Sequence, residues 1–223
     1  MKIKVLKSVL EKNENQAQVN RDLFKKNNVL AVNIMGSPGC GKTTLIEALI
    51  KVLKPAYRIA VIEGDYAGTV DAEKLSAYNI PVVQLDTSSC HLNAHFVGSA
   101  LDHLPLEDLD FVFIENVGNL ICPAEFDIGD LLKLVLYSIP EGDDKPLKYP
   151  LMFSLADAVV LTKTDLKPHF EFDVKKVRDA IARLNGNFEL FEFSRKSDAS
   201  VRPIASFLEN RFRAIALKSY GDL

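Results

Sequence analysis

Short runs of apolar residues alternate with longer amphipathic stretches along most of the chain. The runs are rich in Val, Ile, Leu and Phe, and charged residues stand mainly at their ends: VLAVNIM (29–35), RIAVIEG (58–64), PVVQL (81–85), DFVFIEN (110–116), DAVVLTK (157–163) and NFELFEF (187–193). Nearly continuous apolar strands separated by helices are typical of a parallel sheet that is covered on both faces. The pattern therefore predicts an α/β fold with a mostly parallel β-sheet flanked by helices.

Two stretches depart from this alternation. Residues 9–28 are polar with scattered apolar positions, which predicts an exposed N-terminal helix ending at the Asn27–Asn28 pair. We therefore divide the chain into an N-terminal helical extension, 1–28, and a single domain, 29–223. The stretch 137–150 contains three prolines and a charged turn, so it is predicted to be irregular, and a loop of this length in a compact domain is usually functional.

Composition and charge limit which binding partners and which cellular compartment we expect. The net charge of -3 gives no general attraction to nucleic acid or to an anionic membrane, so neither is expected as a partner. The chain shows no apolar run of about 20 residues that could span a bilayer and no secretory signal at its start. Three cysteines suit no disulfide framework. We expect a cytoplasmic protein whose thiols are free to bind metal.

A phosphate-binding motif follows the first apolar run. The sequence MGSPGCGKTTLIEALI fits the G-x-x-x-x-G-K-[ST] pattern between a predicted strand and an amphipathic helix. Glycines let backbone N–H groups surround the β-phosphate, Lys42 is suited to neutralise the β and γ oxygens, and the Thr43 hydroxyl is a ligand for Mg²⁺. The expected nucleotide-binding residues in this loop are Gly36, Ser37, Gly39, Cys40, Gly41, Lys42, Thr43 and Thr44.

The sequence LTKTDL, at the end of the fifth run, indicates which base is bound. Thr162, Lys163 and Asp165 resemble the guanine-specifying motif [NT]-K-x-D. A carboxylate at Asp165 can accept hydrogen bonds from the ring N–H and the exocyclic amine of guanine, and adenine cannot offer that pair of donors. The stretch 193–198, after the last run, lies where GTPases carry their final base-contacting loop and matches it only loosely. The expected nucleotide is therefore GTP.

Carboxylates stand at the ends of two further runs. Glu63 and Asp65 end the second run, and Glu115 ends the fourth. The carboxyl ends of parallel strands gather beside the phosphate loop, where an acid can hold Mg²⁺ or orient the attacking water. We assign the Mg²⁺ to Thr43, Asp65 and Glu115 and catalysis to Lys42, Asp65 and Glu115, and we interpret Asp71 as a helix cap.

Cys90 and His91 are adjacent in a chain with three cysteines and four histidines. They come just after the third run, at the expected start of a helix, HLNAHFVGSALDHL, and a helix N-terminus favours the thiolate that binds metal. With Cys122, seven residues after Glu115, they make three ligands suited to Ni²⁺ or Zn²⁺, one short of a closed tetrahedral site. Two small buried cysteines are the alternative on spacing alone. His95 is a helix-surface residue or an extra ligand, and His103 and His169 are surface residues.

Five segments in this order resemble one protein family over residues 29–195, the HypB family of nickel-inserting GTPases in hydrogenase maturation. They are GSPGCGKTT, VIEGDYAGTVDAEKL, CHLNA, FIENVGNLICPAEFDIGD and PEGDDKPLKYP. The resemblance implies a P-loop NTPase fold of the SIMIBI class, so that 29–223 is the GTPase (G) domain. It implies a GTP-dependent homodimer that hydrolyses GTP slowly, with a metal site at the dimer interface formed by Cys90, His91 and Cys122. The implied partners are a nickel-handling companion protein and the hydrogenase large subunit.

The sequence departs from the family pattern in places. No Cys or His precedes Cys40, so no nickel-storage tract is expected at the N-terminus, and Thr162 stands where Asn is commoner. No arginine adjoins the nucleotide motifs as a candidate finger, which also predicts slow hydrolysis. Three alternatives stay open: a urease-type nickel GTPase, a P-loop kinase acting on a small molecule, and a nucleotide-binding module with a structural zinc.

Overall fold

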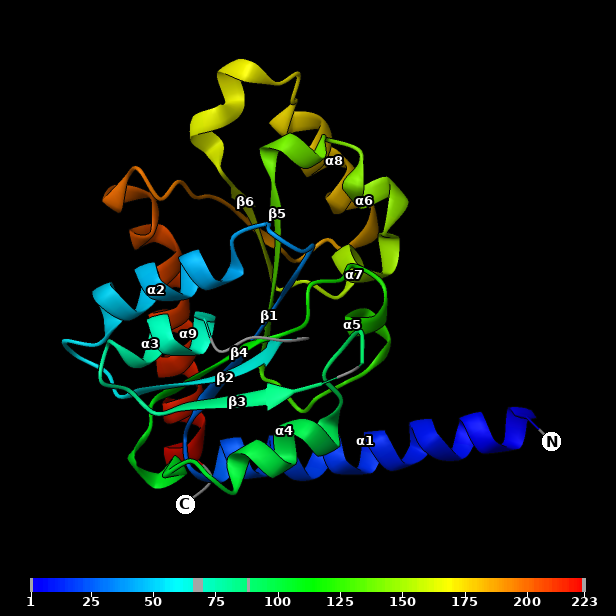
Figure 1. The fold of residues 1–223 in the computed structure, drawn as a ribbon, viewed down its shortest axis with the longest axis vertical. Helices are drawn as coiled ribbons and strands as arrows, with labels where there is room; N and C mark the ends of the chain where they lie inside the picture. The colour runs from blue at the N-terminus through cyan, green and yellow to red at the C-terminus, as the bar shows by residue number, and fades with distance from the viewer. Residues whose placement is uncertain (1, 66–69, 88, 222–223) are drawn as a thin grey trace.

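The apolar runs form the strands of a seven-stranded sheet. The computed structural model describes residues 2–65, 70–87 and 89–221. The sheet has the order β3-β2-β4-β1-β5-β6-β7, and every pair of neighbours is parallel (Figure 1). Its strands are β1 (Leu30–Gly36), β2 (Ile59–Asp65), β3 (Val82–Asp86), β4 (Phe111–Glu115), β5 (Leu132–Ser138), β6 (Ala158–Thr162) and β7 (Glu189–Glu192). The predicted fold class is confirmed.

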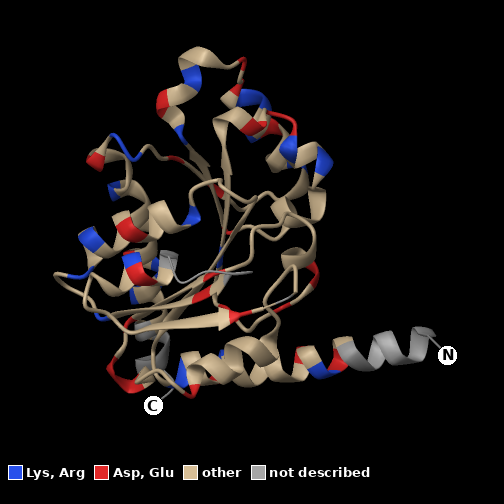
Figure 2. Ribbon diagram, in the orientation of Figure 1, with Lys and Arg blue, Asp and Glu red and all other residues tan. Residues whose placement is uncertain are grey.

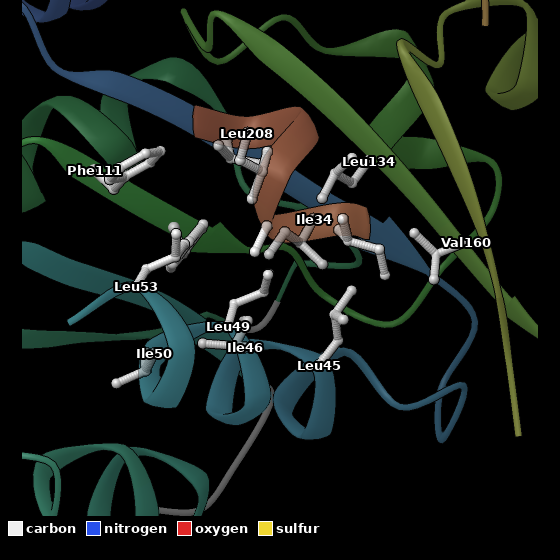
Figure 3. Packing of buried hydrophobic residues seen from close by; sticks show 14 of the residues in the cluster. Ile34, Leu45, Ile46, Leu49, Ile50, Leu53, Phe111, Leu134, Val160 and Leu208 are labelled. Carbon is white, nitrogen blue, oxygen red and sulfur yellow. The ribbon is translucent and has the colours of Figure 1, made fainter. Parts of the chain in front are cut away.

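Helices cover both faces, as predicted. They are α1 (Lys2–Lys26), α2 (Lys42–Leu53), α3 (Val70–Ser76), α4 (Ala94–Leu101), α5 (Cys122–Glu125), α6 (Lys145–Lys148), α7 (Pro150–Ser154), α8 (Val174–Leu184) and α9 (Arg202–Gly221). Alternate residues of each strand face opposite ways. One face of β1 packs against α2 and α9 (Figure 3), and the other contributes to the layers formed with α1, α4, α7 and α8. Each fully buried Leu or Ile in these layers contributes about 1.5–3 kcal/mol to stability.

Charged positions lie mainly outside these packed layers. Figure 2 shows basic and acidic residues interspersed along the ribbon, on the helices and on the loops that follow the strands. None of the helices in the described part of the chain combines the length and the apolarity needed to cross a bilayer.

Strand β5, which pairs with the central strand β1, is absent from the predicted set of strands. It begins two residues after Asp130 and carries Lys133 in an otherwise apolar sequence. The Lys133 ammonium lies 2.6 Å from the Asp130 carboxylate, so the charge is paired at the end of the strand where the chain enters the sheet. A lysine whose charge is paired with a carboxylate three residues earlier interrupts the apolar pattern without interrupting the strand.

The prediction of an irregular segment at 137–150 is wrong. The segment contains the end of β5, a 3₁₀ turn at Ile139–Glu141 and the short helix α6, and α7 begins at its last residue. Prolines at the first turns of these elements lack an N–H that would be unsatisfied there in any case. The prolines therefore mark the starts of elements and do not prevent them.

The N-terminal helix differs from its prediction in length and in exposure. It begins at Lys2, and after it ends Asn28 adopts a left-handed conformation with a φ of 55°, close to the expected end. The helix is not exposed along its whole surface: Asn13, Ala17, Asn20 and Phe24 are buried. It lies alongside α4 and contacts it (Figure 1). Two of these four buried residues are asparagines, so the pattern of apolar residues does not reveal the buried face of α1.

Candidate functional site

The loop between β1 and α2 has the geometry of a phosphate-binding loop. Gly39 and Gly41 have φ values of 71° and 102°, and such left-handed conformations favour glycine. The buried Lys42 side chain turns back over the loop, with its ammonium 3.5 Å from the Gly36 carbonyl and 3.4 Å from the Ser37 carbonyl. The loop therefore carries a fixed positive charge at the N-terminus of α2, where the helix dipole also favours an anion.

A cavity of about 550 Å³ opens between this loop and the ends of β2 and β4. Glu63 and Glu115 are register partners on neighbouring strands, and both are buried at its wall. The Thr43 hydroxyl donates a hydrogen bond of 2.9 Å to the Glu115 carboxylate. A hydroxyl and two carboxylates at one wall are the hard oxygen donors that Mg²⁺ prefers, so these residues fit the ion. None of the described residues lining this cavity is an arginine.

The structure describes the side chains of some of the predicted acids and not of others. It brings Glu115 to the phosphate loop and places Glu63 beside it, although sequence analysis favoured Asp65 over Glu63. The side chains of Asp65 and Asp71 lie outside the described part of the structure. Glu63 is on the same strand as Asp65 and two residues before it, and residues two apart on a strand share a face, so strand alternation gives no signal that favours one acid over the other.

A second cavity, of about 350 Å³, continues from the first and shares Gly39, Gly41 and Thr44 with it. The predicted base-binding residues Lys163 and Asp165 line it, together with Lys196 from the loop after β7. The Asp165 carboxylate accepts a hydrogen bond of 2.7 Å from Ser194 and lies 2.9 Å from the Lys196 ammonium. These contacts hold the pKa of Asp165 below its usual value, with Ser194 the larger cause. The carboxylate is therefore an ionised hydrogen-bond acceptor at the cavity wall.

Thr162 and Cys40 lie beneath this cavity and contact each other. Thr162 is buried, and its hydroxyl donates to the Cys40 carbonyl, so the end of β6 holds the phosphate loop. The Cys40 side chain is fully buried among apolar residues, and burial raises the pKa of the thiol to about 11. Cys40 therefore serves the loop through its backbone and its packing, with a neutral thiol.

Glu141 is a contact of the phosphate loop that sequence analysis missed. Its carboxylate accepts hydrogen bonds from the Ser37 hydroxyl and, at 2.7 Å, from the Ser138 backbone N–H. It also lies 3.6 Å from the Lys145 ammonium. The acid thus joins the 137–150 segment to the phosphate loop. A capping-box pattern, Ser138 with Glu141 three residues later, was the available signal.

The structure brings Cys90, His91 and Cys122 together into one group. The two sulfur atoms lie 2.9 Å apart, and the Cys90 sulfur is 3.6 Å from Nδ1 of His91. One ligand atom from each residue lies within 4.8 Å of the others. Two sulfurs and an imidazole at this spacing fit a soft or borderline cation such as Ni²⁺ or Zn²⁺. Cys90 is exposed and Cys122 partly exposed, so the group is open to solvent.

The surroundings of these three residues set their protonation and orientation. The His91 ring stacks on Phe126 with centroids 4.0 Å apart, and burial lowers the pKa of the imidazole. The hydrogen-bond contact with Cys90 is the main cause that raises the pKa of Cys122, and burial and the repulsion between two nearby thiolates add to it. A neutral imidazole is ready to bind metal, and a cation between the sulfurs removes the repulsion.

The prediction that Cys90 and His91 begin a helix is wrong. Helix α4 starts at Ala94, and Asn93 is its N-cap, accepting hydrogen bonds from the N–H groups of His95 and Phe96. Cys90 and His91 therefore lie in the preceding loop. His95, on the exposed first turn of α4, is not in the metal group of the described residues, and His103 and His169 are exposed as predicted.

A short segment, residues 116–122, joins the phosphate loop to the thiols. Gly118 packs against Pro38 so closely that a Cβ on it would lie 2.9 Å from the Pro38 Cα. The Asn119 N–H donates to the Gly36 carbonyl at 3.0 Å, and its side-chain amide donates to the Cys90 carbonyl at 3.4 Å. The segment ends at Cys122. One asparagine thus contacts both the phosphate loop and a candidate metal ligand.

A phosphate loop on the central strand of an all-parallel sheet, with acids on the neighbouring strands, defines a nucleotide-binding P-loop protein of the SIMIBI class. Residues 30–192 match the family described as CobW/HypB/UreG, nucleotide-binding domain. Within this group the chain belongs to the HypB family.

Individual relatives agree along nearly the whole chain. It is 40% identical to the hydrogenase/urease maturation factor HypB of Helicobacter hepaticus over 94% of this chain and 88% of the relative. It is 41% identical to the probable hydrogenase maturation factor HypB of Methanocaldococcus jannaschii over 95% and 96% of the two chains. The crystal structure of HypB from Helicobacter pylori in complex with nickel superposes with a TM-score of 0.87 at 38% identity, over 91% of this chain and 96% of that one.

Proposed function

We propose that the protein is a GTP-hydrolysing metallochaperone of the cytoplasm that binds nickel at Cys90, His91 and Cys122 and delivers it during hydrogenase maturation. The single observation that carries this proposal is the cluster of three metal-binding side chains joined to a phosphate loop by residues 116–122. The names of the relatives from H. hepaticus and M. jannaschii and the nickel complex of the H. pylori protein support it.

The nucleotide half of the proposal assigns a task to each residue at the two cavities. Lys42 and the loop backbone hold the β and γ phosphates, and Asp165 accepts the guanine N–H groups. Thr43 and Glu115, with Asp65 as the further predicted ligand and Glu63 at the same wall, hold Mg²⁺, which supplies positive charge at the phosphates when bound. Glu115 also positions the attacking water. Hydrolysis is slow because no arginine lines the described phosphate cavity.

A second protomer completes the metal half of the proposal. Three ligands leave a tetrahedral site one short, and two copies supply six. Exposed apolar side chains stand beside Cys122 and on the neighbouring short helices α6 and α7: Ile121, Leu147, Leu151 and Leu155. We propose that GTP and metal promote a homodimer through this face, and that a nickel-handling companion protein and the hydrogenase large subunit bind the loaded form.

Nucleotide and metal are coupled through residues 116–122. A change at the phosphates acts on Pro38 and Gly36, and from there on Gly118 and Asn119, which contact the Cys90 backbone. The Asn116 side chain adds a second connection, because its Oδ1 accepts a hydrogen bond from the Leu92 N–H at 3.0 Å. Both ligand-bearing segments therefore respond to the state of the loop.

The test is titration of Ni²⁺ and Zn²⁺ in the presence of GDP or a non-hydrolysable GTP analogue while the mass of the protein is followed. Cys90→Ala and Cys122→Ala should each lower metal affinity by about 100-fold or more, since each removes one of three ligands. His95→Ala, on the exposed first turn of α4, is the matched control and should bind as wild type. Equal metal affinity in both nucleotide states would refute the coupling, because a ligand shifts an equilibrium only through differential affinity.

Asn119→Ala is expected to uncouple nickel binding from the nucleotide state. It removes the side-chain hydrogen bonds to the Cys90 carbonyl and from the Ile121 N–H and keeps the backbone bond to Gly36, so GDP should bind as tightly as in wild type. The ratio of nickel affinities in the two nucleotide states should fall toward one, because coupling energies of about 1–3 kcal/mol depend on such contacts. Asn187→Ala, on an exposed loop before β7, is the control. An unchanged ratio in Asn119→Ala would exclude this path.

Urease is the second candidate recipient of the metal. The H. hepaticus relative carries a name that covers both hydrogenase and urease maturation. Delivery of nickel from the loaded protein to purified apo-hydrogenase or to apo-urease, measured as metal content of the recipient, distinguishes the two.

A further inference from the structure

The buried face of α1 carries two asparagines whose side-chain N–H groups donate to backbone carbonyls outside the helix. Asn13, Ala17, Asn20 and Phe24 recur at helical spacing, and the exposed fractions of Asn13 and Asn20 are 5% and 0%. A buried side-chain amide costs stability unless its donors and acceptor are satisfied. The contacts of these two amides therefore indicate what this face of the helix holds in place.

Both asparagines bridge the same two backbone segments. Asn13 accepts a hydrogen bond from the Ala94 N–H at 2.9 Å and donates to the Asp127 carbonyl at 2.8 Å. Asn20 donates to the Ala94 carbonyl at 2.8 Å and to the Ile128 carbonyl at 3.0 Å. Two amides, two turns apart on α1, thus connect residue 94 with residues 127–128.

These two segments are the ones that carry the metal ligands. Ala94 follows His91 by three residues, and Asp127 follows Cys122 by five. The ring that stacks on His91 belongs to Phe126, the residue directly before Asp127. The distance between the histidine and the second cysteine therefore depends on how residue 94 is held relative to residue 127.

Close packing leaves α1 little freedom to shift. A Cβ on Gly129, which has a φ of 87°, would lie 2.4 Å from the Ala17 carbonyl oxygen and 2.6 Å from the Cβ of Asn20. Arg21, on the next turn, forms an ion pair with Asp127. The helix is in contact with the backbone of the 127–129 segment, and the position of that segment is tied to the position of the helix.

We propose that Asn13 and Asn20 are positioning residues for the metal group, and that α1 sets the spacing between the segment with Cys90 and His91 and the segment with Cys122. This inference rests on the proposed nickel function. It assigns to the N-terminal helix a role in metal affinity that requires no ligand of its own.

The test uses the full-length chain and Ni²⁺ alone as the probe. Asn13→Leu and Asn20→Leu keep the branched shape and the number of side-chain heavy atoms and remove the bridging hydrogen bonds. Each should weaken nickel binding by about 10-fold or more and shift the thiolate-to-nickel charge-transfer band, as loss of a residue that orients metal ligands does. Gln18→Leu, on the exposed face of α1, is the matched control and should leave both unchanged.

Nickel binding is normalised to the fraction of each sample that binds GDP, so that unfolded protein does not contribute to the measured affinity. If a leucine variant does not fold, Asn13→Ala, nearer the N-terminus of α1, is measured in its place. Nickel affinity and spectrum equal to those of wild type in the folded variants, with only the unfolding temperature lowered, would overturn the inference and leave the proposed function intact. Failure of the wild type itself to bind nickel at the thiols would overturn both.

Discussion

Replacement of Lys42 by alanine should weaken GTP binding by about 100-fold or more and abolish measurable hydrolysis. The ammonium is buried at the phosphate loop, within 3.5 Å of two loop carbonyls, so a bound nucleotide meets a charge that is already in place. Hydrogen bonds to charged groups contribute about 1.5–3 kcal/mol each, and two phosphate oxygens bring the loss to roughly 3–6 kcal/mol. Such a loss corresponds to an affinity change of about 10² to 10⁴.

Calorimetric titration with GDP and with a GTP analogue, together with phosphate release, measures this effect. Lys51→Ala is the matched control, because Lys51 lies on the same helix and its ammonium faces the Tyr78 ring, away from the phosphate loop. Near-wild-type GTP affinity in Lys42→Ala would show that the nucleotide does not bind at this loop.

Asp165→Asn should lower the affinity for GTP by a similar factor and raise the relative affinity for XTP. The carboxylate is ionised, held by Ser194 and Lys196, and presents two acceptor oxygens toward the cavity. Guanine offers two donors to it, whereas an amide presents one acceptor and one donor, so one guanine contact becomes a donor-donor clash. Xanthine has a carbonyl in place of the exocyclic amine and accepts the new donor.

Competition of GDP, XDP and ADP for a fluorescent nucleotide measures this preference. Asp198→Asn, an exposed acid on the same loop as Ser194, is the control and should keep the guanine preference. Unchanged selectivity in Asp165→Asn would place recognition of the base on other residues of the cavity, such as Lys163.

Local sequence patterns predicted those parts of the site whose chemistry is local. A phosphate loop and a base motif are short and contiguous, and the parallel sheet brings their strand ends to one edge whatever the intervening loops do. Three features became clear only from the structure. Strand β5 was missed because Lys133 interrupts its apolar pattern, and the pairing of Lys133 with Asp130 explains why the charge is tolerated there. Glu141 contacts Ser37, which lies 104 positions earlier in the sequence.

The third feature is the buried face of α1. Asn13 and Asn20 count as polar in any periodicity analysis, and only the backbone groups that they contact explain why they are buried. The grouping of Cys90 with Cys122 was predicted from the resemblance more than from spacing, since thirty-two positions separate them. The placement of Cys90 in a loop, outside a helix, followed from Asn93 acting as the cap of α4.

The strand order also determines when these sites can form during synthesis of the chain. Strand β1, which leads into the phosphate loop, pairs on one side with β4 at Phe111 and on the other with β5 at Leu132. Both partners leave the ribosome long after β1, and such distant pairings form slowly. By the time the phosphate loop is held on both sides, the segments with Cys90, His91 and Cys122 have already been synthesised. A nascent chain therefore cannot hold nucleotide in a completed pocket before its thiols are present.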